Sequence, residues 1–465
     1  MIRVNKPKVV YKMSRLKAVI LAAGAGTRMK SELPKVIHKI LGKTMLDYVI
    51  EAAMEAGAED IVVVVGHESE IVKKEISYNV EFVLQEEQLG TGHAVMMAKD
   101  FIGDEGNVLI LFGDTPLITG DTLAKMVDYH IRHNNAATLL STIVEDPTGY
   151  GRIIRDESNT FIKSIEHKDA TEKEKMVKEI NSGMYCFDAK ELNNALDYLT
   201  NDNAQGEYYL PDTLKTIMAK HLNVNAMISD ISEDILGVNS RVQLYQAGQI
   251  MQQRINYKHM DNGVTIINPL CTYISKDACI NSDTIIYPNS FIEGKTIIGN
   301  NCIIGSNSKI VNSNIGNNIN VESSTILDSS ISDNTNVGPY AYIRPNSHIG
   351  SNVKIGDFVE IKNSSVGDNT KVAHLTYIGD ADVGKNVNFG CGTVVVNYDG
   401  VNKNRTVIED NAFIGCNTNL VSPVKVNNNA YTAAGSTITK DVPEYSLGIG
   451  RARQVNIQDW VRKKR

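Results

Sequence analysis

The second half of the chain repeats with a period of six residues, and this feature limits the possible folds more than any other. Isoleucine recurs at six-residue intervals from Ile274 to Ile310. Beyond that run, mostly aliphatic residues continue the same interval with a few shifts of register. The full set is Ile274, Ile280, Ile286, Ile292, Ile298, Ile304 and Ile310; Val337, Ile343, Ile349, Ile355 and Ile361; Val366, Val372 and Ile378; Val383, Phe389 and Val395; and Ile408, Ile414, Leu420, Val426, Thr432 and Ile438.

This spacing predicts a parallel β-helix built from hexapeptide repeats, in which each short strand points one aliphatic side chain inward. Three such strands make a triangular coil of about eighteen residues. Asn and Gly recur between the strands because corners require permissive backbone angles. The alternative is a disordered Asn- and Ser-rich segment, but disorder would not maintain an aliphatic register for so long. We therefore expect an all-β solenoid over residues 263–450.

One segment interrupts the repeat. Between Val395 and Ile408 the chain reads N-Y-D-G-V-N-K-N-R-T (397–406), which is too polar and too long for one edge of a coil. An insertion into a regular solenoid is expelled as a loop, and such loops commonly carry a binding function.

The first half of the chain has a different pattern. Continuous apolar runs at 18–21, 61–65 and 108–112 alternate with amphipathic segments such as 45–56. This alternation is typical of a mostly parallel sheet covered by helices. We expect an α/β, Rossmann-like nucleotide-binding domain over residues 14–240. The Gln-rich stretch 241–262 predicts a single linker helix that ends at Asn-Gly.

Composition restricts the class of protein further. A hydrophobic content of 42% and a charged content of 22% are those of a soluble globular protein. The net charge of −7 argues against general nucleic-acid binding, although the tail 451–465 is basic. No apolar run approaches the roughly 18 residues of a membrane span. The six cysteines contain no C-x-x-C pair, which favours reduced thiols in a cytoplasmic protein over disulfides or a zinc site.

Residues 1–13 lack the apolar core of a signal peptide, and we interpret them as a dispensable extension or the result of an early start codon.

A glycine-containing loop follows the first expected strand: L-A-A-G-A-G-T-R-M-K-S-E-L-P-K (21–35). It is not a P-loop, since no G-K-[ST] follows, and Met29 stands where a dinucleotide fingerprint has its third glycine. The small residues let backbone N–H groups approach a phosphate chain, and Arg28 and Lys35 add positive charge. A glycine turn after a strand can also be purely structural.

The loop resembles the signature of sugar-nucleotide pyrophosphorylases, G-x-G-T-R-M followed by P-K. Further motifs of that family follow in order: Q-E-E-Q-L-G-T-G-H-A (85–94), L-F-G-D-T-P (111–116), T-G-Y-G-R-I (148–153), I-E (165–166), I-N-S-G-M-Y (180–185) and G-V-N-S-R (237–241). With the hexapeptide repeats behind them, nearly the whole chain resembles the bifunctional uridylyltransferase/acetyltransferases that make UDP-N-acetylglucosamine for peptidoglycan and other cell-envelope polysaccharides. This resemblance also implies a left-handed β-helix.

In the first domain, the resemblance implies that N-acetylglucosamine 1-phosphate attacks the α-phosphorus of UTP and expels pyrophosphate. The phosphate nucleophile is already ionised, so positioning and charge neutralisation by Arg28 and Lys35 suffice. The implied nucleotide contacts are Leu21, Ala22, Ala23, Gly24, Gln85, Gly90 and Thr91; the sugar contacts are Gly151, Glu166 and Asn181; and the Mg²⁺ ligands are Asp114 and Asn239. Asp114 ends an apolar strand, where ligands bind in such sheets, although a turn carboxylate is the alternative. Phe112 stands where relatives often carry Tyr.

Charged side chains are sparse in the solenoid, which makes Arg344, Lys362 and His374 stand out. Arg344 and Lys362 are eighteen residues apart, so we expect them to stack on adjacent coils, as a phosphate site requires. The alternative for each cation is a solvated surface position. Lys362 and His374 are twelve residues apart and therefore do not stack directly.

The resemblance assigns acetyl transfer from acetyl-CoA to glucosamine 1-phosphate to this region, in a site shared between the subunits of a homotrimer. His374 would be the general base that deprotonates the amine, with Glu360 as a candidate to orient it. The implied sugar-phosphate contacts are Arg344, Lys362, Tyr377 and Asn388, and the implied acetyl-CoA contacts are Cys391, Asn397, Tyr398, Cys416, Ala434 and Arg451, of which Asn397 and Tyr398 also reach the sugar phosphate. Cys391 and Cys416 stand where relatives commonly have Ala and Ser. A Cys391 nucleophile is a rival mechanism, but direct transfer needs none.

Two other functions remain open at this point. A nucleotidyltransferase with a purely structural solenoid would not need Arg344, Lys362, His374 and Tyr377, and a pure scaffold would not need the complete glycine loop.

Overall fold

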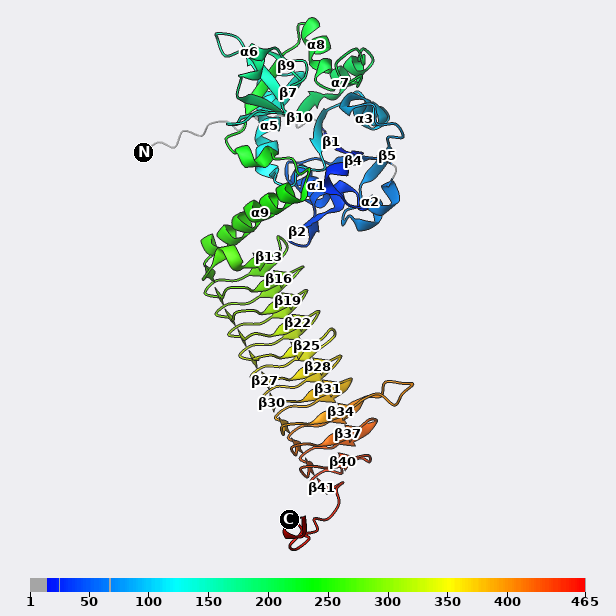
Figure 1. Cartoon of the computed structure of the whole chain (residues 1–465), viewed down its shortest axis with the longest axis vertical. Coiled ribbons are helices and arrows are strands. Elements are labelled where there is room, and N and C mark those ends of the chain that lie inside the picture. Colours follow the sequence, from blue (N-terminus) through cyan, green and yellow to red (C-terminus); the bar gives the residue numbers. More distant parts are fainter. Residues whose placement is uncertain (1–14, 25, 67, 465) are drawn as a thin grey trace, which may run out of the picture. The chain divides into compact units, whose positions relative to one another are not determined.

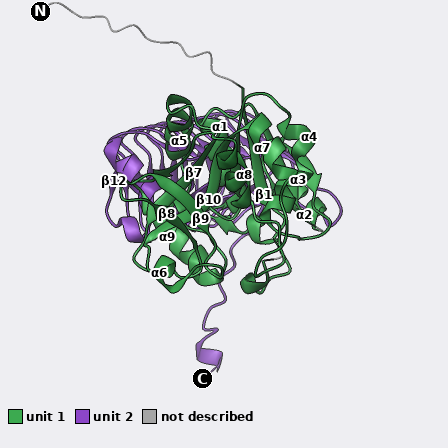
Figure 2. Cartoon of the chain, turned by 90° about the horizontal axis from the view of Figure 1, so that it is seen from above, with its two compact units in different colours: residues 1–251 green, residues 252–465 purple. Residues whose placement is uncertain are grey.

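The computed structural model describes residues 15–24, 26–66 and 68–464, so the expected extension at 1–13 lies outside the described residues. Two compact units divide the chain, residues 1–251 and 252–465 (Figures 1 and 2). The boundary falls within α9 (Arg241–Asp261), the helix expected at 241–262. No helix in the described part of the chain is long and apolar enough to cross a membrane.

Unit 1 contains a mostly parallel sheet. Its strands lie in the order β11 (Val224–Ile228), β7 (Ala137–Ile143), β10 (Glu179–Asp188), β6 (Asn107–Phe112), β1 (Leu16–Ala22), β4 (Asp60–Val65) and β5 (Glu81–Leu84). Only β10 runs antiparallel to its neighbours on this path. The hairpin of β8 (Gly151–Arg155) and β9 (Phe161–Ile165) extends from β10. The Rossmann-like expectation is confirmed.

Helices cover both faces of this sheet because its strands are apolar on both sides. Ala18 and Ile20 pack with α1 (Met45–Glu55) and α5 (Gly120–Arg132) on one face. Val19 and Leu21 face the opposite side and pack with other helices. These are α3 (Thr91–Met97), α7 (Ala189–Leu196) and α8 (Asp212–Ala219). The shorter helices are α2 (Ser69–Glu75), α4 (Lys99–Ile102) and α6 (Glu172–Lys175).

The carboxyl ends of β1 and β6 lie side by side, with Leu21 opposite Phe112. The N–H of Gly113 donates to the carbonyl of Leu21 at 2.9 Å. The glycine loop after β1 and the aspartate after β6 therefore both follow the carboxyl ends of neighbouring strands, which is where ligands bind in open α/β sheets.

Unit 2 is a left-handed parallel β-helix with three sheets. The first runs from β12 (Thr265–Ile266) to β41 (Leu447–Gly448), the second from β13 (Tyr273–Ile274) to β40 (Thr437–Ile438), and the third from β14 (Cys279–Ile280) to β38 (Val424–Val426). Every residue of the predicted six-residue register is buried.

The register also continues where no repeat was expected, between Ile310 and Val337. Four further residues fill the interior there: Ile315, Val321, Ile326 and Ile331. Several steps are five residues long instead of six, so Ile310 pairs with Ile326, sixteen positions on, whereas Ile343 pairs with Ile361, eighteen positions on. The expected coil of eighteen residues is thus only the longest regular coil, because individual corners can lose a residue.

Candidate active sites

A cavity of about 320 Å³ opens where β1 and β6 end. Most of the residues expected to hold the nucleotide line it: Leu21, Ala22, Ala23, Gly24, Lys35, Gln85, Gly90, Thr91 and Asp114. Gly26 has a φ of 58°, and a Cβ there would lie 2.7 Å from the Cβ of Lys35. Glycine is therefore needed for the loop to pass so close to Lys35.

Gln85 is almost fully buried in the wall of this cavity. Its Nε2 donates to the carbonyl of Gly90 at 3.3 Å and lies 3.0 Å from Nδ1 of His93. Gln88, which was not singled out from the sequence, also lines the cavity and donates from Nε2 to the carbonyl of Ala23 at 2.5 Å. Gln88 could have been found from the motif Q-E-E-Q-L, since the two glutamines of this motif are three residues apart and precede the glycine turn.

Lys35, Asp114 and Asn239 converge at one point of the cavity. The Nζ of Lys35 lies 2.5 Å from Oδ2 of Asp114 and 3.0 Å from Oδ1 of Asn239. Because one nitrogen contacts both oxygens, both oxygens can reach a single cation. A carboxylate and an amide oxygen are ligands that suit a hard divalent ion such as Mg²⁺. The residues therefore fit the expected metal.

Arg28 is not among the residues that line the cavity. It lies exposed on the 3-10 turn Thr27–Met29 at the rim of the glycine loop. Of the two cations expected to meet the triphosphate, the structure brings Lys35 into the cavity and leaves Arg28 in solvent.

A second cavity of about 180 Å³ shares Thr91 and Phe112 with the first. The three expected sugar contacts, Gly151, Glu166 and Asn181, all line it. The two cavities therefore adjoin, which is the arrangement that a nucleotide and a sugar phosphate need in order to react.

Asn181 is held rigidly in this second cavity. Its Nδ2 donates to the hydroxyls of Ser164 at 3.0 Å and Tyr185 at 2.7 Å, and its Oδ1 accepts from the N–H of Gly183 at 2.8 Å. Gly183 has a φ of 83° within a register shift of β10, and a Cβ there would lie 2.6 Å from the ring of Phe112.

Glu166 lies beside Gly151, where a Cβ added to the glycine would be 3.4 Å from Oε1. Burial raises the pKa of Glu166 above its ordinary value, and the neighbouring carboxylates of Asp169, Asp212 and Glu207 raise it further. The carboxyl oxygens of Glu166 can accept hydrogen bonds from a sugar hydroxyl.

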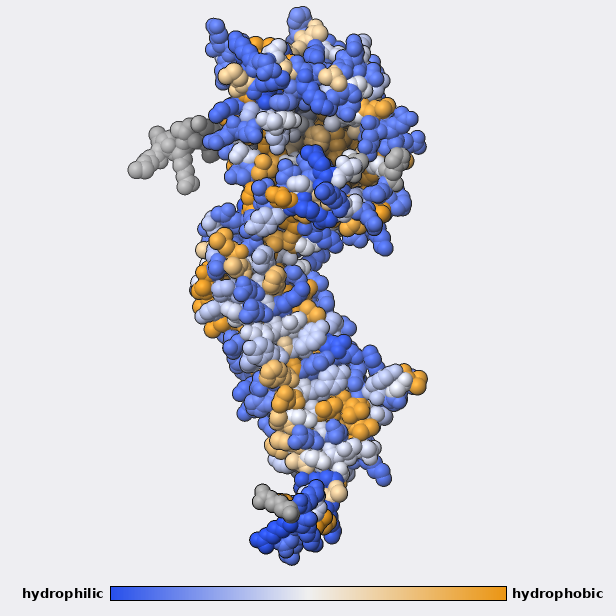
Figure 3. Space-filling view, viewed as in Figure 1, coloured by the Kyte–Doolittle hydropathy of each residue, from blue (hydrophilic) through white to orange (hydrophobic). Residues whose placement is uncertain are grey.

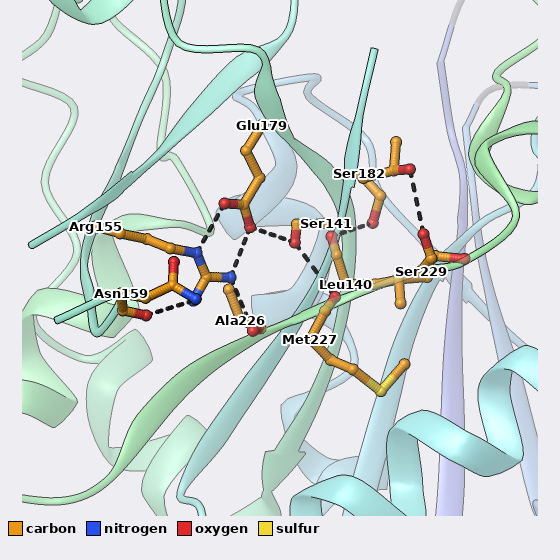
Figure 4. A network of polar contacts seen from close by, with 10 residues as sticks. Leu140, Ser141, Arg155, Asn159, Glu179, Ser182, Ala226, Met227 and Ser229 are labelled. Carbon is orange, nitrogen blue, oxygen red and sulfur yellow. Dashed lines mark hydrogen bonds and ion pairs between the residues drawn. The ribbon is translucent and has the colours of Figure 1, made fainter. Parts of the chain in front are cut away.

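A largely buried ion pair joins strands that also carry residues of the sugar cavity (Figure 4). Nε and Nη2 of Arg155 each donate to a carboxylate oxygen of Glu179 at 2.7 Å, and the hydroxyl of Ser141 donates to the same carboxylate at 2.6 Å. Nη2 of Arg155 also reaches the carbonyl of Ala226 at 3.0 Å. The pair joins β8 to β10 in the register that places Gly151 opposite Asn181.

In unit 2, Arg344 and Lys362 stack on adjacent coils. The N–H of Arg344 donates to the carbonyl of Ile361 at 2.8 Å, in the strand pair β25 (Tyr342–Ile343) and β28 (Glu360–Lys362). Nη1 of Arg344 lies 2.8 Å from Oε1 of Glu360.

His374 is oriented by a residue that the sequence did not reveal. Nδ1 of His374 lies 2.6 Å from Oδ1 of Asp357, because β27 (Lys354–Asp357) pairs with β30 (Lys371–His374). The hydrogen bond with His374 lowers the pKa of Asp357. The prediction that Glu360 orients His374 is wrong, since Glu360 lies on a different sheet and pairs with Arg344.

The interrupting segment is a loop that projects beside β34 (Val394–Val396), as Figure 1 shows. Its residue Lys403, also not foreseen, brings its amine next to that of Lys362 and close to Arg344. The hydrogen bond and charge of Lys362 lower the pKa of Lys403, whereas the hydrogen bond with Lys403 raises the pKa of Lys362, as does the charge of Asp380. Three basic groups thus gather at one place.

The remaining expected residues lie on neighbouring coils. Tyr377 stands opposite Glu360 in the register of β28 and β31 (Tyr377–Gly379), and Asn388 begins β33 (Asn388–Phe389) next to β30. Asn397 is buried at the root of the loop, whereas Tyr398 is exposed and donates to the carbonyl of Gly400 at 2.6 Å.

Cys391, Cys416 and Ala434 follow one another on successive coils. The N–H of Asn417 donates to the carbonyl of Cys391, and the N–H of Gly435 to that of Cys416, each at 2.7 Å. Nη1 of Arg451 donates to the carbonyl of Ala434 at 2.8 Å. These residues thus form one continuous strip of the solenoid surface.

Family profiles of known proteins match residues in both units of the chain. The nucleotidyl transferase profile matches residues 17–246, the hexapeptide profile of bacterial transferases matches 280–312, and the profile of the GMPPB C-terminal domain matches 329–435. Over 452 residues the chain is 58% identical to the Bifunctional protein GlmU of Caldanaerobacter subterraneus subsp. tengcongensis, covering 97% of this chain and 99% of that one. The chain belongs to the GlmU family.

Other members of the GlmU family are similarly close. The chain is 56% identical to the Thermoanaerobacter pseudethanolicus protein, over 97% of this chain and 99% of that one, and 55% identical to the Clostridioides difficile protein, over 96% and 98%. Like them, it is a bifunctional transferase of UDP-N-acetylglucosamine synthesis, with a nucleotidyltransferase domain and a hexapeptide acetyltransferase domain.

Proposed function

We propose that unit 2 acetylates glucosamine 1-phosphate with acetyl-CoA and that unit 1 then joins the product to UTP. The observation that carries this division is that each unit has its own set of candidate site residues. Lys35, Asp114 and Asn239 converge in unit 1, whereas in unit 2 Arg344 and Lys362 stack on adjacent coils and Asp357 orients His374. We infer a cytoplasmic enzyme, because UTP and acetyl-CoA are cytoplasmic substrates.

In unit 1, the glycine loop, Gln85, Gly90 and Thr91 bind the nucleotide in the larger cavity, and Gly151, Glu166 and Asn181 bind the sugar in the smaller one. A bound Mg²⁺, held by Asp114 and Asn239, would neutralise the phosphate charge. Lys35 in the cavity and Arg28 at its rim would add positive charge for the triphosphate. The phosphate oxygen of the sugar attacks the α-phosphorus while the bond to pyrophosphate breaks.

In unit 2, Asp357 accepts the Nδ1–H of His374, which leaves the lone pair on Nε2. Nε2 takes a proton from the amine of glucosamine 1-phosphate, and the amine nitrogen attacks the thioester carbon of acetyl-CoA. The carbon–sulfur bond breaks, and the thiolate of CoA leaves with the proton. Arg344, Lys362 and Lys403 bind the phosphate, with Tyr377 and Asn388 as further sugar-phosphate contacts.

Acetyl-CoA lies along the strip of Cys391, Cys416, Ala434 and Arg451, with Asn397 and Tyr398 beside it. The thiol of Cys391 takes no part in the transfer, and the cysteines serve through their backbone groups.

The site in unit 2 is completed by further copies of the chain in a homotrimer. Three bulky residues, Tyr340, Phe358 and Leu375, occupy successive left-handed corners and are exposed. The rings of Tyr340 and Phe358 stack with centroids 5.4 Å apart. Figure 3 shows patches of apolar side chains on one face of unit 2. Exposed apolar side chains such as Tyr340, Phe358 and Leu375 suit burial against another copy.

The test is to measure thiol release from acetyl-CoA with glucosamine 1-phosphate for the wild type and for His374→Ala. We expect the substitution to lower the rate by at least about 100-fold, because it removes a general base. Uridylyl transfer should be unchanged in the same variant. A wild type without thiol release would favour the nucleotidyltransferase with a structural solenoid, and a fully active variant would refute His374 as the base.

A further inference from the structure

Asp380 occupies a corner of the β-helix. The equivalent corners on the coils below it form a column of turn residues. The corners below Asp380 in this column are Gly294, Asn312, Asp328, Asn346 and Asn363, and all of them, like Asp380, have positive φ angles. An exposed pair in this column, Asn312 and Asp328, shows the ordinary contact, in which Nδ2 of the asparagine donates to Oδ1 of the aspartate at 3.2 Å. Stacked Asn and Asp side chains of this kind stabilise the turn and need no ligand.

Asp380 departs from this pattern because it is only 7% exposed and has additional partners. Its Oδ1 accepts from Nδ2 of Asn363 at 2.6 Å, as the column predicts. Its Oδ2, however, accepts from Nδ2 of Asn397 and lies 3.5 Å from Nζ of Lys362. Both of these partners belong to the proposed acetyl-transfer site.

The backbone of Asp380 makes two more bonds in the same region. Its N–H donates to the carbonyl of Lys362 at 2.9 Å, and its carbonyl accepts from the N–H of Thr406 at 3.1 Å. Asn397 and Thr406 are the two ends of the projecting loop. Asp380 therefore holds both ends of the loop that carries Lys403.

The chemistry of a carboxylate determines what Asn397 presents to a ligand. An ionised carboxylate only accepts hydrogen bonds, so Asn397 must turn its NH₂ group toward Asp380 and its carbonyl oxygen away. Burial alone would raise the pKa of Asp380, but the hydrogen bonds from Asn363 and Asn397 and the charge of Lys362 bring it below its ordinary value. The side chain is therefore ionised at neutral pH.

We propose that Asp380 is a positioning residue for acetyl transfer, which directs the carbonyl oxygen of Asn397 toward an N–H group of the substrate and holds the ammonium of Lys362 in place for the phosphate. This role rests on the proposed acetyltransferase function of unit 2. The recognised group is an amine or amide N–H on a phosphorylated amino sugar or its acyl donor.

The experiment compares Asp380→Asn with Asp328→Asn, the exposed aspartate of the same column. An amide at position 380 places one NH₂ group against another and removes the charge beside Lys362. We expect KM for glucosamine 1-phosphate to rise about tenfold or more in Asp380→Asn, as for loss of a charge-assisted contact. Asp328→Asn should retain the wild-type KM, and both variants should retain uridylyl transfer.

A second variant separates positioning from folding. Asp380→Gly suits the φ of 50°, and Gly294 already occupies this column, so the backbone corner should still form. Because Asn397 and Lys362 lose their acceptor, the melting temperature should fall, and KM is therefore measured at a temperature at which the variant is folded. It should show the same rise in KM. Wild-type KM in both variants would overturn the positioning role alone, as would a loss of activity that follows the folded fraction. A wild type that releases no thiol would overturn the proposed function as well.

Discussion

His374 obtains its orientation from the coil beneath it, through Asp357, and not from its own strand. Seventeen positions separate the two residues, which is one coil at this point of the solenoid. The proposed phosphate site is built in the same way, because Arg344 and Lys362 come from stacked coils and Lys403 reaches them from the projecting loop. At the scale of single residues, the stacking of coils brings into contact side chains that are distant in the sequence.

Replacing Asp357 with asparagine tests this orientation directly. The amide can donate to Nδ1 and so stabilise the wrong tautomer of His374, with the proton on Nε2. We expect kcat for acetyl transfer to fall about 100-fold, within the range for general-base catalysis, while KM changes little. Thiol release gives both constants.

Ser330→Ala is the matched control for this prediction. Ser330 lies 2.8 Å from Nδ1 of His348, another histidine of the solenoid, and removing its hydroxyl should leave acetyl transfer unchanged. Wild-type kcat in Asp357→Asn would refute the role assigned to the carboxylate.

At the scale of elements, one ion pair joins four strands of unit 1. Arg155 on β8 and Glu179 on β10 contact each other and also β7 and β11 through Ser141 and Ala226. Their side chains are only 15% and 11% exposed. A buried pair of this kind does little for net stability compared with apolar residues, but losing one partner leaves a buried charge.

Glu179→Ala should therefore destabilise unit 1 by about 3 kcal/mol, the lower end of the range for breaking a buried pair. It should also raise KM for N-acetylglucosamine 1-phosphate, because Gly151 and Asn181 depend on the β8–β10 register. Loss of uridylyl transfer in increasing urea reports the unfolding of unit 1 alone.

The comparison variant is Asp128→Ala, which removes an exposed helical ion pair with Arg132. Such pairs contribute about 0.5 kcal/mol or less. Equal urea midpoints for the two variants would contradict the argument for Glu179.

At the scale of the whole molecule, the two activities occupy separate compact units. The proposed metal ligands, Asp114 and Asn239, both belong to unit 1. The proposed acetyl transfer needs no metal, since His374 and the cations of unit 2 carry out its steps.

Chelation of divalent ions should consequently stop uridylyl transfer and leave acetyl transfer intact. Adding Mg²⁺ should restore the first activity. In Asp114→Asn, the Mg²⁺ concentration for half-maximal uridylyl transfer should rise at least about tenfold, because one ligand charge is lost. Parallel assays of pyrophosphate release and thiol release measure the two activities, and equal sensitivity of both to chelation would contradict their separation.

The sequence by itself determined the fold of both units. Each strand of a hexapeptide repeat has one inward aliphatic residue, so these residues recur at a regular interval in the sequence. Buried parallel strands appear as continuous apolar runs. The glycine loop and its family motifs also identified most residues that line the two cavities of unit 1. Gln88 was missed, although its motif was noted.

Only the tertiary structure decided which residues meet across coils. Coil lengths vary between sixteen and eighteen residues in the regular part, so sequence distance does not give the register from one coil to the next. For that reason Glu360 was assigned to His374 in place of Asp357. Lys403 was missed because a loop that leaves the solenoid follows no repeat. Asp380 was missed because it occupies an ordinary corner of the solenoid, and only its hydrogen bonds to the two ends of that loop distinguish it.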